Sequence, residues 1–369
     1  MTLVDQIESK RKEIHSDAYP MSIGEIINLY TDKELDIHPE FQRIYRWTDI
    51  QKSRLIESIL LGIPLPSFFV AQREDGIWDV VDGLQRLSTI FSFLGIYRNE
   101  NDELEAPLIL QGTEYLPSLE GVAWSEKFQP ENYLSTELQR AFKREKIDLK
   151  IIKKESDQQT KYELFQRLNT FGSSLSDQEV RNCLLIMIDK TFYDWIKKLS
   201  QYPAFLETLT ITDRQIDEQY HLELVLRYLI LKDVNIDEVK NIPDLGDFIT
   251  REIKTLAIQE DFDRTTAEAE FQKTFDIINI ALGDNAFRKF HNSKYTGGFS
   301  ISIFEVLALG LGKHINHYDL GNKDDIAKII EISQSINSNP RYALKSGSGY
   351  KASNRLPFIL PLGWELFEK

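Results

Sequence analysis

The chain has 369 residues, of which 42% are hydrophobic and 28% are charged, and its net charge is −14. This length predicts two domains, and this balance is typical of globular proteins, which excludes a disordered or low-complexity chain. The net charge argues against a protein that coats nucleic acid non-specifically. The single cysteine, Cys183, excludes a disulfide within a monomer and a cysteine-rich zinc site. Residues 1–11 lack the apolar run of a secretory signal, and no segment resembles a membrane span, so we predict a cytoplasmic protein with no membrane partner.

The first part of the chain predicts a mixed α/β unit. Ser22 and Glu25 form a capping box at a helix start, and Asp75-Gly76 is a tight turn between two apolar runs. In chain order we expect a helix from 23 to 30, a strand over 35–38, a helix from Thr48 or Asp49 to Gly62, strands over 67–71 and 77–81, and a helix from Asp82-Gly83 to Gly95.

The rest of the chain changes character twice. Residues 100–135 are rich in turn formers and predict an irregular insert, and 147–152 indicates another strand. The chain is then helical: we expect helices over 157–168, 176–198, 203–208, 213–231, 244–258, 263–281, 285–290, 300–314 and 323–337, followed by a loop-rich, then apolar segment over 338–369. The fold class is therefore α+β, with an α/β lobe over 1–155 and a mostly α-helical lobe over 156–369.

The segment Trp78 to Thr89 predicts an anion site. A strand ends in Asp82, Gly83 makes the turn, and the next helix opens with unpaired backbone N–H groups. Arg86 is a forked donor suited to phosphate, and Asp82 suits Mg²⁺ or a water. Gln85 can position the phosphate or the nucleophile, and the hydroxyls of Ser88 and Thr89 follow closely. The alternative is structural: Asp82 caps the helix, and Arg86 is its salt-bridge partner.

Two further segments add candidate ligand contacts. Gln42 and Arg43 lie in a loop that is rich in arginine and aromatic residues. Asn169 and Gly172 lie in an Asn/Gly/Ser loop that precedes the capping box Ser176 to Glu179. Aromatic core packing in the first loop and a plain helix–loop–helix joint in the second are the structural alternatives.

Basic residues gather in two places despite the acidic balance. The window 140–154 holds seven basic and two acidic residues, and 338–356 holds four basic residues and no acidic one. A solvated surface is the alternative, but we select Lys153, Lys154, Lys351 and Arg355 as candidate DNA contacts. The glycine-rich loop 346–355 lacks the G-K-[ST] sequence of a Walker loop.

The order and spacing of these motifs resemble one known family. The series FQRIYRW, QKSRLIESILLGIPLP, VVDGLQRLST and RLNTFGSSLSDQEVRN, over about residues 20–185, resembles the N-terminal domain of GmrSD-type modification-dependent restriction enzymes, which belongs to the ParB/sulfiredoxin-like group. The family signature is D-G-Q-Q-R, and here Leu84 replaces its first glutamine.

The resemblance implies a nucleotide-binding, NTP-hydrolysing sensor or switch in a DNA restriction system that acts against phage. It implies a nucleoside triphosphate with Mg²⁺ as the ligand. The catalytic residues would be Asp82, Gln85 and Arg86, with Asp82 on the metal, and the residues that contact the nucleotide would be Gln42, Arg43, Gly83, Ser88, Thr89, Asn169 and Gly172.

Many family members carry a C-terminal HNH nuclease domain, which needs a histidine-centred metal site. The only close histidine pair here is His314 and His317, and no HNH pattern surrounds it. We therefore expect a separate nuclease chain as partner, with modified or foreign DNA as a further partner and an oligomer as an open possibility. The alternatives are a non-catalytic nucleotide- or DNA-binding module and, in last place, a ParB-like DNase.

Overall fold

The computed structural model describes residues 2–5, 16–37, 47–99, 101–153, 177–240, 242–344 and 351–369, without the side chains of Asp177, Glu179, Cys183, Met187 and Asp217. The chain divides into two compact units, Met1–Leu175 and Ser176–Lys369. The division therefore falls later than the predicted one after residue 155. No described helix has the length and apolar character that a membrane crossing requires.

The first unit is a five-stranded mixed sheet in the order β1-β5-β3-β4-β2. β1 is antiparallel to β5, β5 is parallel to β3, β3 is antiparallel to β4, and β4 is parallel to β2. The elements are β1 (Ser16–Ser22), α2 (Ile23–Thr31), β2 (Leu35–Asp36), α3 (Asp49–Leu60), β3 (Phe68–Gln72), β4 (Trp78–Asp82), α4 (Leu84–Leu94), η2 (Pro117–Leu119), α5 (Thr136–Arg144) and β5 (Lys146–Ile152).

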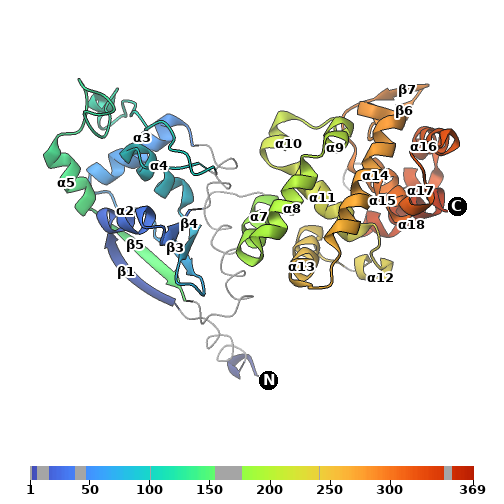
Figure 1. The fold of residues 1–369 in the computed structure, drawn as a ribbon, viewed down its shortest axis with the longest axis horizontal. Coiled ribbons are helices and arrows are strands. Elements are labelled where there is room, and N and C mark those ends of the chain that lie inside the picture. Colours follow the sequence, from blue (N-terminus) through green and yellow to red (C-terminus); the bar gives the residue numbers. More distant parts are fainter. Residues whose placement is uncertain are drawn as a thin grey trace. The chain divides into compact units, whose positions relative to one another are not determined.

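The helices of this unit gather on one side of the sheet (Figure 1). Strand residues that alternate along the chain, such as Phe68 and Val70, pack there against helix residues such as Ile56 and Leu87 in one apolar core. Lys146, Asp148 and Lys150 occupy the alternate positions of β5 and are exposed. The mixed α/β prediction is confirmed, and the ParB/sulfiredoxin-like topology remains a prediction.

Local sequence signals set most element ends here. Ser22, Thr48 and Ser135 each accept a first-turn N–H at a helix start, and Thr48 and Gln51 complete a capping box. Gly95 ends α4 in the left-handed conformation, at φ 68°. β1 was not predicted, because Ser16–Ser22 is largely polar, contains Pro20 and is paired only with β5 as an edge strand.

The second unit is helical. Its elements are α7 (Asp177–Ile188), α8 (Lys190–Ser200), α9 (Pro203–Thr208), α10 (Asp213–Asp217), α11 (Tyr220–Leu231), α12 (Ile236–Val239), α13 (Leu245–Ile258), α14 (Arg264–Leu282), η3 (Gly283–Asn285), β6 (Lys289–His291), β7 (Lys294–Thr296), α15 (Ile301–Lys313), η4 (Ile315–His317), α16 (Lys323–Ser335), η5 (Ile336–Ser338), α17 (Pro340–Ala343) and α18 (Ala352–Phe367). The helices predicted over 203–208, 244–258, 263–281, 300–314 and 323–337 match described helices to within about two residues.

Four predictions in this unit need correction. The helix over 176–198 is broken at Asp189, which caps α8, and the helix over 213–231 is broken at Gln219, whose φ is 56°. Residues 286–290 are not helical: β6 begins at Lys289, and Asn292 and Ser293 with positive φ turn it into β7. The segment after 351 forms α18 although it contains Pro357 and Pro361, because its apolar side chains pack on α15. The helix predicted over 157–168 lies outside the described residues.

Candidate functional site

The turn between β4 and α4 is built around Gly83. Its φ of 98° is left-handed, and a Cβ atom at this position would lie 2.4 Å from Cδ1 of Phe68. Only glycine satisfies both conditions. Gly83, and not Asp82, is the N-cap of α4, and no side chain caps the first turn. The first-turn N–H groups of α4 are therefore not occupied by a capping side chain.

A bulge places Asp82 at this turn. Val70 lies opposite Val80, but Phe69 lies opposite Asp82, so Val81 is an extra residue on β4. The Asp82 side chain is 34% exposed and its Oδ2 accepts a hydrogen bond from Nη2 of Arg86 at 2.9 Å. Oδ1 accepts from no group in the part of the chain that the structure describes. The predicted alternative is thus half right, because the Asp82–Arg86 pair exists and the Asp82 cap does not.

Arg86 makes three polar contacts and one ring contact. Besides Asp82, it donates through Nη1 to the carbonyl of Pro66 and through Nη2 to the carbonyl of Ser67 at 3.3 Å. Its Cζ lies 4.3 Å from the centre of the Phe68 ring. The side chain is 12% exposed, and burial lowers the pKa of Arg86 against the opposing effect of Asp82.

Gln85 is a donor without an acceptor. Its Nε2 is buried and has no hydrogen-bond partner among the residues that the structure describes. A buried amide in this state loses the free energy of a hydrogen bond unless a further group supplies the acceptor. The turn thus combines uncapped helix N–H groups, one open carboxylate oxygen and one unused amide donor. That combination suits a phosphate carrying a divalent cation.

Of the other residues predicted to contact the nucleotide, the structure describes Ser88 and Thr89, and neither offers a free hydroxyl proton to this turn. Ser88 and Thr89 are buried in the second turn of α4 and donate to the carbonyls of Leu84 and Gln85 at 2.8 and 2.7 Å. Both hydroxyl protons are therefore already used in hydrogen bonds within the helix. Five predicted contacts lie outside the described residues, namely Gln42, Arg43, Lys154, Asn169 and Gly172.

The sequence did not predict a polar cluster at the other end of β4, next to the β3–β4 hairpin. Arg73 donates to both carboxylate oxygens of Asp79, with Nε to Oδ2 at 2.8 Å, and to Oδ2 of Asp36 at 2.7 Å. Burial alone would lower the pKa of Arg73, but these two ion pairs outweigh it and raise the pKa. The cluster ties β2 and β4 to the hairpin. The sequence around Asp36, Arg73 and Asp79 contains no pattern that predicts their contact.

The predicted DNA contacts that the structure describes differ in their surroundings. Lys153 pairs with Asp17 at 3.3 Å, and Lys351 is exposed before α18. Arg355 corrects the prediction, because its Nε and Nη2 each donate to Glu305 at 2.8 Å. The Arg355 guanidinium is 14% exposed and Glu305 is fully buried. Arg355 is an internal ion-pair residue and is not displayed to a DNA backbone.

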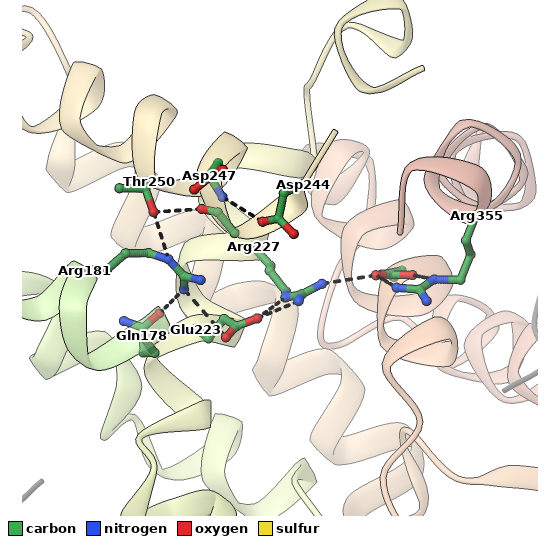
Figure 2. A network of polar contacts seen from close by, with 10 residues as sticks. Gln178, Arg181, Glu223, Arg227, Asp244, Asp247, Thr250 and Arg355 are labelled. Carbon is green, nitrogen blue, oxygen red and sulfur yellow. Dashed lines mark hydrogen bonds and ion pairs between the residues drawn. The ribbon is translucent and has the colours of Figure 1, made fainter. Parts of the chain in front are cut away.

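Arg355 ends a chain of ion pairs through the second unit (Figure 2). Arg181 lies 3.6 Å from Glu223, Glu223 accepts two hydrogen bonds from Arg227, and Arg227 reaches Glu305 at 3.4 Å. Burial alone would raise the pKa of Glu223, but Arg227 and Arg181 outweigh it and lower the pKa. Arg181 also donates to Gln178 and Thr250. The motif DQEVRN therefore contributes Arg181 to the buried ion-pair network of the second unit.

Exposed cations gather at the end of α5 and along β5. Arg140, Lys143 and Arg144 lie within one turn of helix, and Lys146 and Lys150 follow on the strand. All five are exposed. Within the described ranges none of the five forms an ion pair, although Lys150 lies 5.3 Å from the Phe69 ring centre.

The histidine pair forms no metal centre with its described surroundings. His314 follows the end of α15 and His317 lies in η4, with ring centres 6.3 Å apart. Among the residues that the structure describes, no group of three His, Cys, Asp or Glu side chains is placed to hold a metal ion.

Comparison with known families identifies one domain. Residues 23–186 match the family model described as the GmrSD restriction endonuclease, N-terminal domain. The matched range confirms the resemblance expected over about 20–185. No curated protein and no solved structure matches the chain.

Proposed function

We propose, from the GmrSD N-terminal domain that residues 23–186 form, that this protein is the nucleotide-binding sensor or switch of a DNA restriction system. The nucleotide binds by its phosphates at the β4–α4 turn. The observation that carries this assignment is the set of unused polar groups there: the uncapped N–H groups of α4, Asp82 Oδ1 and Gln85 Nε2.

Mg²⁺ fits this turn through Asp82. Mg²⁺ in phosphate sites usually takes one or two carboxylates and fills its remaining positions with phosphate oxygens and water. Asp82 offers one exposed carboxylate oxygen at the point where the helix N–H groups converge. A bound Mg²⁺ would neutralise phosphate charge and lower the barrier to phosphoryl transfer. The protein's own residues hold and orient: Gly83 lets the backbone approach the phosphate, and Gln85 donates to it.

Nucleotide titration tests this proposal. The purified protein is titrated with ATP, GTP and CTP, with and without Mg²⁺, by calorimetry, and phosphate release is followed in parallel. We expect binding of one nucleotide, weakened at least about tenfold in Asp82→Asn, because one metal ligand or charge-assisted contact is lost.

Asp148→Asn is the matched control, because Asp148 is an exposed carboxylate on β5 of the same sheet. Binding that is equal in wild type and Asp82→Asn would refute the site. Binding without phosphate release would assign a sensor that does not hydrolyse its ligand, in keeping with Leu84 in the motif.

We further propose that a separate chain cuts the DNA. The support is that no HNH sequence pattern surrounds His314 and His317. A plasmid-nicking assay with Mg²⁺ or Mn²⁺ tests this proposal. Nicking by the purified chain alone would contradict it.

A second candidate function is DNA binding by the α5–β5 cations. Five exposed cations without a described acidic partner are a local exception in a chain of net charge −14. We expect duplex binding that weakens as salt rises, with a log–log slope that falls by about one for each phosphate contact removed. Lys143→Gln with Arg144→Gln should lower the slope, whereas Lys153→Gln, which breaks the pair with Asp17, should not. Binding that is insensitive to salt would refute this function.

A further inference from the structure

We infer that Arg86 is a positioning residue: it fixes Asp82 and the segment Gly62–Ser67 and does not itself grip the ligand. The inference rests on the proposed phosphate site and reassigns its most obvious phosphate contact. The Arg86 side chain makes four contacts: hydrogen bonds to Pro66 O, Ser67 O and Asp82 Oδ2, and a stacking contact with the Phe68 ring.

Three of the five N–H groups of Arg86 donate to acceptors within the protein. Nη1 donates to Pro66 O, and Nη2 donates to both Ser67 O and Asp82 Oδ2. One face of the guanidinium lies on the Phe68 ring. A guanidinium that binds a phosphate bidentately needs two parallel N–H groups free on one edge. Nη1 and Nη2 already serve three acceptors of the protein.

Arg86 packs closely against Gly83 and Phe68. A Cβ atom on Gly83 would lie 2.4 Å from Phe68 Cδ1 and 3.2 Å from Arg86 Nη2. The three residues are thus in close packing, and Phe68 is fully buried. Turning the guanidinium toward a ligand would also leave the carbonyls of Pro66 and Ser67 without this donor.

The segment that Arg86 holds has few other fixed points. It begins at Gly62, with a φ of 68°, and Ile63 N donates to Ser58 O at 2.8 Å. Pro64 and Pro66 have no N–H to donate. Gly62, Ile63, Pro64 and Leu65 also line a pocket of about 240 Å³. Arg86 therefore connects this proline-rich segment to the carboxylate of the candidate site.

The consequence is that the shape of the side chain matters more than its charge. A lysine keeps the positive charge, but its single ammonium cannot serve three acceptors and stack on Phe68 at the same time. Arg86→Lys should then behave like Arg86→Ala. If Arg86 held the phosphate by charge, the lysine variant would keep most of the affinity.

Two measurements on the full chain test the inference. The first measurement is amide hydrogen exchange over residues 62–68 without nucleotide. The exchange rate should rise at least about tenfold in Arg86→Lys, because the loss of one charge-assisted hydrogen bond changes a local opening equilibrium by about that factor. Arg54→Ala, an exposed arginine on α3, is the control and should leave this exchange unchanged. Unchanged exchange in Arg86→Lys would overturn the inference, whether or not any nucleotide binds.

A double-mutant cycle supplies the second measurement, with Mg²⁺ and the nucleotide that the wild type binds. If Arg86 acts through Asp82, then Arg86→Lys should weaken binding little further in an Asp82→Asn background. Additive losses would mean that Arg86 contacts the ligand directly, which overturns the inference. Phe68→Leu is the second variant should Arg86→Lys fail to fold, because Phe68 is fully buried and its ring supports the Arg86 guanidinium. With Phe68→Leu, unchanged exchange over 62–68 would likewise overturn the inference. A wild type that binds no nucleotide refutes the proposed function and leaves the exchange result to decide the role of Arg86.

Discussion

At the scale of single residues, Gly83 is a position where backbone conformation and side-chain packing both require glycine. Its φ is 98° and its missing Cβ leaves room for Phe68, whereas Gly76 has a φ of 90° and no atom within 4 Å of a Cβ. Alanine at either position costs about 1–2 kcal/mol in the left-handed region, and overpacking adds about 1–3 kcal/mol at Gly83 alone. We expect Gly83→Ala to lower the free energy of unfolding clearly more than Gly76→Ala. Urea denaturation measures both, and equal losses would contradict the contact with Phe68.

His221 at the start of α11 predicts a pH effect on stability. Burial lowers its pKa to about 4, and the residue is 7% exposed. The unfolded chain, where the pKa is about 6.5, binds the proton first as pH falls. The free energy of unfolding should therefore decrease from about pH 6.5 down to pH 4, by an amount of the order of 3 kcal/mol. His221→Gln should flatten that part of the curve and the exposed control His291→Gln should not. A parallel decline in wild type and His221→Gln would refute the assignment.

At the scale of elements, the sequence predicts those parts of the fold that local chemistry determines. Thr48 and Gln51 mark the start of α3, and Asp75-Gly76 marks the hairpin between β3 and β4. The failures are elements that depend on distant partners. β1 is a polar edge strand held by β5, and α18 contains two prolines and is held by α15. No local pattern carries those partners, so the propensity of the segment misleads.

The contact between α15 and α18 predicts a sensitive position within an element. A Cβ atom on Gly310 would lie 2.6 Å from the carbonyl oxygen of Gly363 and 2.8 Å from Cδ2 of Phe367. Gly310→Ala should therefore lower the free energy of unfolding by about 1–3 kcal/mol, although alanine is the better helix former. Gly321→Ala is the control, since its nearest atom would be Asp319 Oδ1 at 3.5 Å. Stabilisation by Gly310→Ala would show that the two helices are not in contact there.

At the scale of the whole molecule, the basic residues fall into two groups: some form buried ion pairs, and others are exposed on the surface. The sequence places Arg355 and Lys143 in two similar basic windows, but Arg355 is paired with buried Glu305 and Lys143 is exposed on α5. Composition cannot make that distinction, because it depends on which carboxylates the fold brings near. The turn at Asp82 to Arg86 was predicted from its order of residue types. The internal use of Arg86 was not, because its acceptors are backbone carbonyls on another segment.

This sorting predicts opposite effects for the two windows. Arg355→Gln leaves Glu305 with only Arg227, and breaking a buried pair costs about 3–5 kcal/mol, so the variant should be strongly destabilised with no specific effect on DNA affinity. Lys351→Gln, the exposed neighbour on the same segment, should be neutral. Urea denaturation and DNA titration of both variants separate the roles. An Arg355→Gln variant of normal stability and weakened DNA binding would restore the original DNA-contact assignment.

The packing of α18 on α15 also sets an order for synthesis. Almost all of α15 is buried, and α18 covers part of it, with Gly363 and Phe367 next to Gly310. Tyr318 donates a hydrogen bond to the carbonyl of Phe367. The ribosome releases α18 after every other element of the second unit. Until then the part of α15 that α18 covers stays exposed, so the apolar core of the helical unit is completed last. The sheet of the first unit, complete at β5, closes long before.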